Sequence, residues 1–454
     1  MTQCVEQLDF GFLHGKQICA RFDGGELSSD GGVMLLAEAD QRLGLTAALA
    51  ACVPDPRDQS QVQHSWRTLF AQRIYQIACG YEDADDADDL RGDWAFKTAL
   101  GRRPETDRDL ASQPTFSRFE NGVSRTALRR MADVFVAQFV TRYATRRKCR
   151  LILDFDATDD PTHGQQQFAA FHGYYKGHCY LPLIVTAQVD DGPQELLVTM
   201  LRPGNADAAA YAVAILKRLV PRLRRACPKA TFLFRADGGF ARPELYDWCE
   251  DEAHRVDYEI NLPQNRVLQR WAAPHLATVH ALHGETGQWQ RRFAEVLYQA
   301  QDWPQPRRVV IKAEVTVKDN GETRDNPRFV VTNLTAGQAQ AIYEHYGDRG
   351  EMENRIKELK NQLQMDRTSC HRFVANQVRV WLHAAAYLLH CELRRQLPGT
   401  ALAAAQVATL QRKLLKVAVR IAESVRRIWL HFASSYPWRE LWALLLWRLR
   451  AAPT

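Results

Sequence analysis

Two apolar runs that each end in an aspartate constrain the fold of this chain more than any other feature. The first reads Arg-Leu-Ile-Leu-Asp-Phe-Asp and ends at Asp156; the second reads Thr-Phe-Leu-Phe-Arg-Ala-Asp and ends at Asp237. Runs of β-type residues without polar alternation are typical of strands buried in the centre of a sheet. We therefore predict two central strands whose far ends carry chemistry. Asp154 shares a strand face with Asp156, so it is an alternative first acid.

Further segments complete a mixed α/β arrangement. The sequence predicts strands over 183–189, 195–201 and 256–260, and helices over 208–220 and from Pro243. Residues 263–328 interrupt this pattern: 265–281 is mixed, 289–298 and 308–318 are predicted strands, and Asp319-Asn320-Gly321 is a hairpin turn between strands. A strand over 328–332 follows.

Both ends of the chain are predicted to be helical. Residues 29–45 and 66–79 carry apolar residues at helical steps, as do 373–395 and 404–432. Trp438, Trp442 and Trp447 have the spacing of an apolar helix face. Two helices around Gly122 are compatible with a helix-turn-helix DNA reader, although any helical hairpin gives the same pattern. The predicted domains are 1–149, 150–262, 263–328, 329–400 and 401–454.

The run from Tyr346 to Lys360 is predicted to be a helix with two distinct faces. One face carries a single carboxylate among three cations, and it consists of Arg349, Glu353, Lys357 and Lys360. The adjacent stripe is apolar and consists of Met352, Ile356, Leu359 and Leu363. Asp348 can cap the helix, with Glu351 as its capping-box partner. The alternative interpretation of the charged face is a solvated, salt-bridged surface.

Composition permits a polyanionic partner. The net charge is +6, and arginine, whose planar fork suits phosphate, is the main cation. The ten cysteines contain no Cys-x2-Cys pair, and no apolar run approaches the ~20 residues of a membrane span, so we expect a cytoplasmic protein. Three carboxylates brought together need cations, and their hard oxygens suit Mg²⁺ or Mn²⁺. Two such ions ~3.5–4 Å apart can stabilise both oxygens of a phosphoryl displacement.

The spacing Tyr-x2-Arg-x3-Glu-x6-Lys, filled by Tyr346, Arg349, Glu353 and Lys360, resembles the signature of bacterial insertion-sequence transposases of the Asp-Asp-Glu (DDE) superfamily. The string Ser-Gln-Pro-Thr-Phe-Ser-Arg-Phe-Glu-Asn from residue 112 is similar to one in insertion-sequence group 1380. This resemblance implies a ribonuclease-H-like mixed sheet with flanking helices and a β-rich insertion, which 263–328 would supply.

The resemblance also implies roles for individual residues. Asp156, Asp237 and Glu353 would bind two metal ions, with Asp156 preferred over Asp154 because Asp-x-Thr, ending at Thr158, matches the first motif of the family. The residues expected to contact DNA are Tyr346, Arg349, Lys357, Lys360 and Thr158. Related transposases hold a flipped base with a tryptophan of the insertion; Trp289 is preferred to Trp303 because Arg291 and Arg292 follow it.

The sequence therefore predicts a bacterial DDE transposase that binds terminal inverted repeats as a homodimer. It would cut the 3′ ends with metal-activated water and join them to target DNA. One alternative is a nuclease of the same fold that cuts double-stranded DNA without joining it. Another is a DNA-binding regulator in which the acids are structural.

Overall fold

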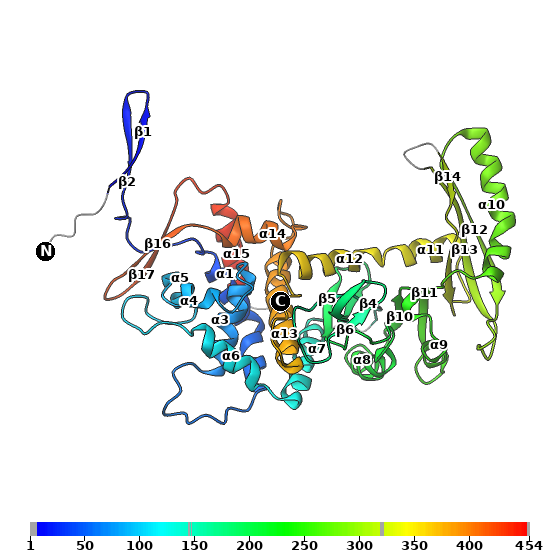
Figure 1. Cartoon of the computed structure of the whole chain (residues 1–454), viewed down its shortest axis with the longest axis horizontal. Helices are drawn as coiled ribbons and strands as arrows, with labels where there is room; N and C mark the ends of the chain where they lie inside the picture. Colours follow the sequence, from blue (N-terminus) through cyan, green and yellow to red (C-terminus); the bar gives the residue numbers. More distant parts are fainter. Residues whose placement is uncertain (1–6, 144–145, 147, 318–321, 452–454) are drawn as a thin grey trace. The chain divides into compact units, whose positions relative to one another are not determined.

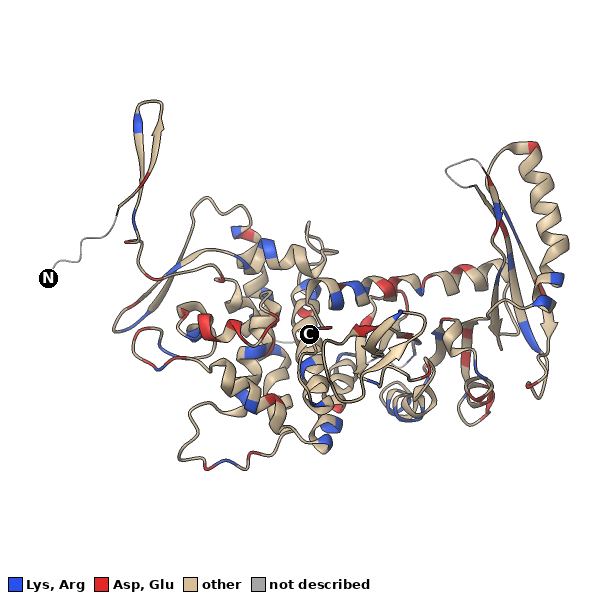
Figure 2. Cartoon of the chain, viewed as in Figure 1, with Lys and Arg blue, Asp and Glu red and all other residues tan. Residues whose placement is uncertain are grey.

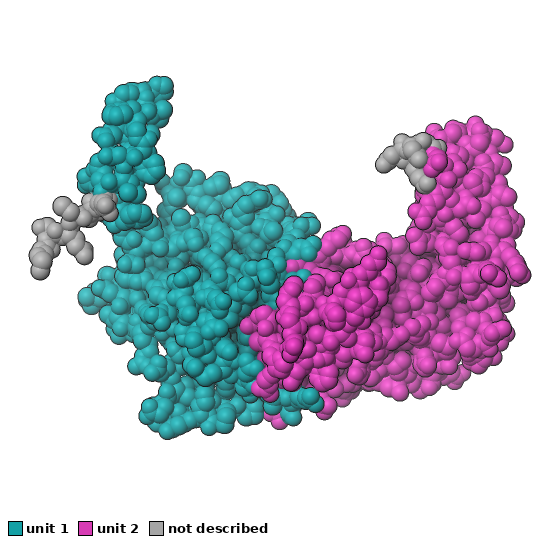
Figure 3. All heavy atoms as spheres, viewed as in Figure 1, with its two compact units in different colours: residues 1–127, 361–367, 382–454 teal, residues 128–360, 368–381 magenta. Residues whose placement is uncertain are grey.

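The computed structural model describes residues 7–143, 146, 148–317 and 322–451. The chain divides into two compact units (Figure 3). Unit 1 contains residues 1–127, 361–367 and 382–454, and unit 2 contains residues 128–360 and 368–381. The finer division into five parts remains a prediction.

Unit 2 is built on one mixed sheet (Figure 1). Its central strands are β4 (Arg150–Ala157), β8 (Leu183–Val189), β9 (Glu195–Met200), β10 (Thr231–Ala236) and β11 (Val256–Asn261). β4, β10 and β11 are parallel, and β8 and β9 continue the sheet beyond β4 in antiparallel pairs. A parallel trio with an antiparallel pair beside its first strand is the arrangement of a ribonuclease-H-like core, so the predicted fold class is confirmed.

The central strands form because both of their faces are covered. Every side chain from Leu151 to Phe155 is buried, and Leu151, Leu153 and Phe155 join a core with Val185, Phe234 and Tyr258. The helices α8 (Ala212–Ala226) and α9 (Pro243–Glu250) contact each other, and α9 contacts β11. α8 begins after the predicted start at residue 208 and continues through Pro221 for five more residues.

The insertion extends the same sheet beyond β11 through β15 (Arg328–Thr332), β13 (Arg307–Val317) and β12 (Gln290–Tyr298), with β14 (Thr323–Asp325) beside β13. The prediction of a mixed segment over 265–281 was wrong, because α10 (Arg266–Thr286) occupies it. Asn265 caps α10 by accepting hydrogen bonds from the N–H groups of Val267 and Leu268. α10 contacts β12 and β13 (Figure 1). The Asp319-Asn320-Gly321 turn lies outside the described residues.

The charged run of the sequence continues a preceding helix. α11 (Ala339–Gly347) is followed closely by α12 (Gly350–Lys357) and by a π-helical turn, Glu358–Gln362. The prediction that Asp348 caps the start of a helix was wrong: Asp348 has helical backbone angles at the end of α11, and no side chain caps α12. Met352, Leu359 and Leu363 of the predicted apolar stripe are buried.

Unit 1 is mostly helical. Its helices are α1 (Val33–Leu43), α2 (Leu45–Ala51), α3 (Trp66–Ala78), α4 (Asp86–Leu90), α5 (Trp94–Ala99), α6 (Gln113–Gly122), the second half of α13 (Phe373–Arg395), α14 (Val407–Leu410) and α15 (Arg439–Arg450). α7 (Arg125–Tyr143) lies mainly in unit 2. The predicted helices at 29–45, 66–79 and 373–395 and the two predicted around Gly122 are confirmed as elements. None of the described helices is long and apolar enough to cross a membrane.

Strands in unit 1 were not predicted. β1 (Leu8–Leu13) and β2 (Lys16–Ala20) form a hairpin, and β3 (Leu27–Ser28), β16 (Val419–Glu423) and β17 (Ile428–Phe432) form a small sheet. The predicted helix over 404–432 was therefore wrong beyond residue 415. Val419 and Ile421 are buried while Arg420 between them is exposed, which is the two-residue period of a strand. Trp447 is exposed, and α15 buries Leu445 and Leu449 instead.

Candidate functional site

Two of the three predicted acids lie at one edge of the central sheet. Asp156 is the seventh residue of β4, and Asp237 directly follows β10, its parallel neighbour. The Asp237 carboxylate accepts a hydrogen bond of 2.9 Å from the N–H group of Gly239 and so caps a short 3-10 turn. A Cβ atom on Gly238 would lie 2.9 Å from the Asn261 Nδ2 atom, so a larger residue in the turn that presents Asp237 would displace the Asn261 side chain.

Arg349 connects Asp156 with Glu353. Its Nη1 atom lies 3.1 Å from Asp156 Oδ2, and its Nη2 atom lies 3.1 Å from Glu353 Oε1. The Asp156 side chain is 14% exposed and that of Glu353 is 51% exposed. Helix α12 therefore brings its single face carboxylate to the sheet edge through a shared guanidinium. Figure 2 shows acidic and basic residues interleaved along α12 beside β4.

Electrostatics place Asp237 in the same site. Burial raises the pKa of Asp156 to about 7; the negative charges of Asp237 and Glu353 act in the same direction, and Arg349 opposes them. Burial also raises the pKa of Tyr346 to about 12, with Arg349 opposing and Asp237 contributing. The Arg349 guanidinium lies 5.9 Å from the centre of the Tyr346 ring. Three acids, one arginine and one tyrosine thus share one electrostatic environment.

Asp154, the alternative first acid, has a different environment. It is fully buried, and Arg235 donates to its two oxygens at 2.7 and 2.8 Å. The Gln194 amide donates a third hydrogen bond at 2.5 Å. These donors fix the carboxylate in the sheet, which favours a structural role. The sequence analysis gave Arg235 no role, although it stands two residues before Asp237 and directly opposite Asp154 in the β10–β4 register.

The two lysines of the charged face are placed differently. The Lys360 Nζ atom donates to the Asp159 carboxylate at 2.7 Å and to its carbonyl oxygen at 2.8 Å, and it lies 3.4 Å from the Thr158 hydroxyl. Lys360 therefore holds the segment that follows β4. Lys357 is exposed, and no ion pair holds it within the described part of the chain. Asp159 as the partner of Lys360 was not predicted.

The two candidate tryptophans are also distinguished. Trp303 is buried, and its ring lies 5.3 Å from Tyr246 and 5.4 Å from Tyr298, which makes it a core residue. Trp289 is 49% exposed just before β12, and the Arg291 guanidinium lies 5.2 Å from its ring centre.

A row of rings leads from Trp289 towards the acids. Arg291 pairs with Glu344 of α11 at 3.1 Å and also lies 5.4 Å from the Phe293 ring. From there the row passes from Phe293 to Tyr343 at 5.6 Å and from Tyr343 to Tyr346 at 6.2 Å. The exposed tryptophan of the insertion is thus joined by contacts to the tyrosine beside Arg349.

The chemistry of the donors fits a divalent cation. Asp156, Asp237 and Glu353 offer hard carboxylate oxygens, and burial raises the pKa of Asp156 although Arg349 lies beside it. As they stand, no three acidic, histidine or cysteine side chains among the described residues converge closely enough to hold a metal ion. Arg349 is the cation that lies between Asp156 and Glu353 in this structure.

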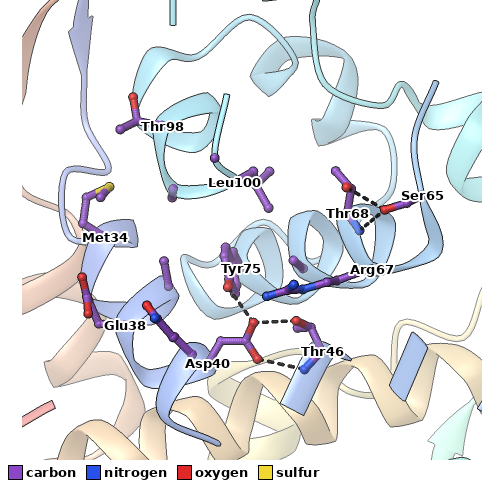
Figure 4. A pocket seen from close by; sticks show the side chains of 15 residues that line it. Met34, Glu38, Asp40, Thr46, Ser65, Arg67, Thr68, Tyr75, Thr98 and Leu100 are labelled. Carbon is purple, nitrogen blue, oxygen red and sulfur yellow. Dashed lines mark hydrogen bonds between the residues drawn. The ribbon is translucent and has the colours of Figure 1, made fainter. Parts of the chain in front are cut away.

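Unit 1 contains a pocket of about 620 Å³ (Figure 4). Its polar centre is Asp40, whose carboxylate accepts hydrogen bonds from the Thr46 N–H group at 2.8 Å and from the Tyr75 hydroxyl at 2.8 Å. The Thr46 hydroxyl donates to the same carboxylate. Burial, with Asp40 beside it, raises the pKa of Tyr75. With its acid saturated by protein donors, this pocket offers no reactive group comparable to those at the sheet edge.

Comparisons with known proteins identify the family of this chain. The fold is similar to that of a solved structure, the cryo-EM structure of the piggyBac transposase synaptic complex with hairpin DNA, with 11% sequence identity and a TM-score of 0.41 over 85% of this chain and 79% of that chain. A likeness at this level adds nothing to the assignment. No match was found among curated proteins. The family described as transposase DDE domain group 1 matches residues 10–454, nearly the whole sequence. The chain belongs to this family of DDE transposases.

Proposed function

We propose that this transposase binds the terminal inverted repeats of an insertion sequence, cuts the 3′ ends and joins them to target DNA. The observation that carries the proposal is the Arg349 bridge, which gathers Asp156 and Glu353 at the sheet edge beside Asp237. A set of three carboxylates with one mobile cation among them suits phosphodiester chemistry better than any other arrangement found in the described residues.

Each residue has a role that follows from its position. Asp156, Asp237 and Glu353 would hold Mg²⁺ or Mn²⁺, two ions in all, which when bound neutralise the charge of the phosphodiester at the cut. Arg349 would leave the carboxylates and donate its planar fork to a DNA phosphate. Tyr346, beside the guanidinium, would position Arg349. Thr158 and Lys360 would fix the backbone next to Asp156, and Lys357 would contact phosphate from the exposed face.

Trp289 fits a base-holding role. It is exposed, a cation lies over its ring, and the row of rings connects it to Tyr346. An unpaired base loses its stacking energy, and an aromatic platform restores about 1–3 kcal/mol of it. We assign Trp289, and not the buried Trp303, to a base displaced from the duplex near the cut.

The finer family assignment rests on sequence motifs. The Tyr346 to Lys360 spacing and the string from Ser112 to Asn121 support a place in insertion-sequence group 1380 with the Tyr-Arg-Glu-Lys signature. With that place come a bacterial cytoplasmic setting and a homodimer on double-stranded DNA, which form part of the same proposal.

The test uses a labelled duplex containing the terminal repeat that flanks the gene, incubated with Mg²⁺ and an unlabelled target plasmid. Wild-type protein should cut the 3′ end and attach it to the plasmid. Asp156→Asn, Asp237→Asn and Glu353→Gln should each abolish cutting while repeat binding persists, because the three acids act as one unit.

The same experiment separates the alternatives. Cutting without joining would identify a nuclease of this fold. Binding without cutting by the wild-type protein in Mg²⁺ and in Mn²⁺ would indicate a DNA-binding regulator and end the proposal.

A further inference from the structure

A small hairpin with several aromatic residues lies next to the strand ends that carry the acids. β5 (Asp160–Pro161), β7 (Gly177–Tyr180) and β6 (Ala170–His172) form a sheet in the order β5-β7-β6. This small sheet continues the antiparallel pairing of β4 with β8. Asp156 pairs with Ile184, and four residues further along, Asp160 of β5 pairs with Tyr180 of β7. β5 and β6 therefore lie beyond the end of β4 at which Asp156 stands (Figure 1).

The base of this hairpin is firmly held. Asp160 is buried and accepts a hydrogen bond of 2.8 Å from the Thr368 hydroxyl. The Tyr180 hydroxyl donates to the Gln167 carbonyl oxygen at 2.8 Å. A Cβ atom on Gly204 would lie 2.0 Å from the Cys179 carbonyl oxygen, so that neighbouring backbone packs directly on β7. A rigid base means that the tip is presented in a defined place.

The tip of the hairpin is exposed and aromatic. Tyr174 in the turn is 82% exposed, and Phe171 of β6 is more than half exposed. Large apolar side chains gathered on a surface mark interaction sites. Lys176, also exposed, lies beside them with a left-handed φ of 54°, a conformation that a turn normally gives to glycine or asparagine. The turn thus keeps a lysine where glycine or asparagine would fold with less strain.

Tyr175, the next residue, is less exposed than Tyr174 and lies near enough to the acids for their charges to act on it. Its side chain is half-buried, and its pKa is raised by burial and then by the negative charges of Asp159, Asp156 and Asp237. Its ring lies 5.0 Å from that of Tyr174. The described part of the chain provides no hydrogen-bond partner for its hydroxyl. Of the two neighbouring tyrosines in this turn, Tyr174 is therefore exposed to solvent and Tyr175 is half-buried near the acids.

We propose that the hairpin of residues 168–178 binds an unpaired nucleotide of the DNA strand held at the acids, with Tyr174 stacked on its base and the Tyr175 hydroxyl donating to its phosphate. Bases within a duplex already stack on one another, so only an unpaired base offers its face to a tyrosine. Lys176 supplies the charge that a phosphate requires. The inference rests on the proposed function, and its site is separate from Trp289 in the insertion.

The experiment compares two fluorescein-labelled DNAs, a short duplex and the same duplex with an unpaired fork at one end. Binding is measured by fluorescence anisotropy in the presence of Ca²⁺ in place of Mg²⁺, so that binding is measured without cleavage. Wild-type protein should prefer the fork by about tenfold, within the range for one stacked base. Tyr174→Ala should remove that preference, and Tyr175→Phe should reduce it. Trp447→Ala, which removes an exposed aromatic in unit 1, is the matched control and should leave it unchanged.

The outcomes are decisive in both directions. Equal binding of fork and duplex by wild-type protein, or an unchanged preference in Tyr174→Ala, would overturn the proposal. Tyr174→Leu separates stacking from general apolar contact: full preference in this variant would also count against a stacked base. The thermal stability of each variant is measured in parallel, so that misfolding is recognised. Because no cleavage is required, these results stand apart from the Mg²⁺ cleavage assay that tests the proposed function.

Discussion

Asp154 and Asp156 lie on one strand face, and burial raises the pKa of both, but they differ in the number of donors that hold each carboxylate. Asp154 accepts two hydrogen bonds from the fully buried Arg235. Asp156 instead contacts one guanidinium nitrogen of Arg349, at the partly exposed end of β4. A carboxylate saturated by fixed donors cannot readily turn to an incoming ion. Among the described residues, the salt bridge of Asp156 is with Arg349 alone, and a metal ion could replace that one cation. We therefore prefer Asp156 to Asp154 as the first acid because of their partners and not because of the strand pattern.

Replacing each aspartate by asparagine should separate structure from chemistry. Asp154→Asn removes the carboxylate that is hydrogen-bonded to the buried Arg235, and breaking a buried ion pair typically costs about 3–5 kcal/mol. Asp156→Asn should retain the fold and lose cleavage. Denaturant unfolding and the terminal-repeat assay measure the two effects. A stable Asp154→Asn protein that has lost cleavage, beside an active Asp156→Asn protein, would reverse the assignment.

The raised pKa of Asp156 predicts a pH-dependent stability. Its folded pKa of about 7 lies above its ordinary value of 3.8, so the folded protein retains a proton that the unfolded chain has lost. The associated stability is complete below pH 4 and is lost as the pH rises through about 7. In EDTA, Asp156→Asn should match wild type at pH 4 and exceed it by up to about 4 kcal/mol at pH 8. Parallel stability curves for the two proteins would contradict this.

At the scale of the element, the two lysines of the predicted charged face, one on α12 and one on the π-helical turn, have different environments. Lys360 is tied to Asp159 next to β4, while Lys357 extends into solvent. Lys357→Ala should therefore lower the slope of log K against log salt for DNA binding by about one. Lys229→Ala is the matched control, because Lys229 is exposed at the opposite end of β10 from Asp237. An equal change in both variants would show only a loss of net charge.

The insertion offers a second prediction at this scale. In a terminal-repeat duplex with 2-aminopurine beside the cut, stacking on Trp289 should change the fluorescence of the displaced base. Trp289→Ala should abolish that change, and Arg291→Gln should weaken it, because Arg291 lies over the indole and connects it to α11. An identical signal from wild type and Trp289→Ala at matched stability would remove Trp289 from the site.

How much of each element could be predicted depended on how local its cause is. The bounds of β8 and β15 were predicted to the residue, and those of β4, β10 and β11 to within two residues. A strand that is buried on both faces consists of a continuous apolar run, which can be recognised in the segment itself. Asp156 and Asp237 were predicted from the ends of these same runs, whereas Glu353 was predicted from the spacing of the Tyr346 to Lys360 segment. β16 was missed because its partner is β3: Val419 pairs with Ser28 across almost the whole sequence, and no local period reports such a pairing. Arg235 and Tyr175 were missed because their partners come from other segments.

At the scale of the whole molecule, segments near the beginning and near the end of the sequence pack against each other in unit 1. The Gly31 N–H group donates to the Val417 carbonyl oxygen at 2.9 Å, and the Gly32 N–H group donates to that of Leu415 at 3.1 Å. Helices α1 and α15 contact each other, and Glu38 forms an ion pair with Arg450. The C-terminal segment is therefore a structural part of the unit that begins the sequence.

Gly32 tests this packing directly. A Cβ atom at Gly32 would lie 2.0 Å from the Leu414 carbonyl oxygen and 2.4 Å from the Leu415 Cα atom, and backbone atoms cannot move aside as a flexible side chain can. The φ of Gly32 is −73°, which alanine adopts freely, so Gly32→Ala adds a clash without backbone strain. We expect loss of amide-exchange protection in β3 and β16, with β4 and β10 still protected. Gly92→Ala is the control, since a Cβ atom there meets nothing within 4 Å. Unchanged protection of β3 and β16 in Gly32→Ala would show that the two ends of the chain do not close unit 1 through this contact.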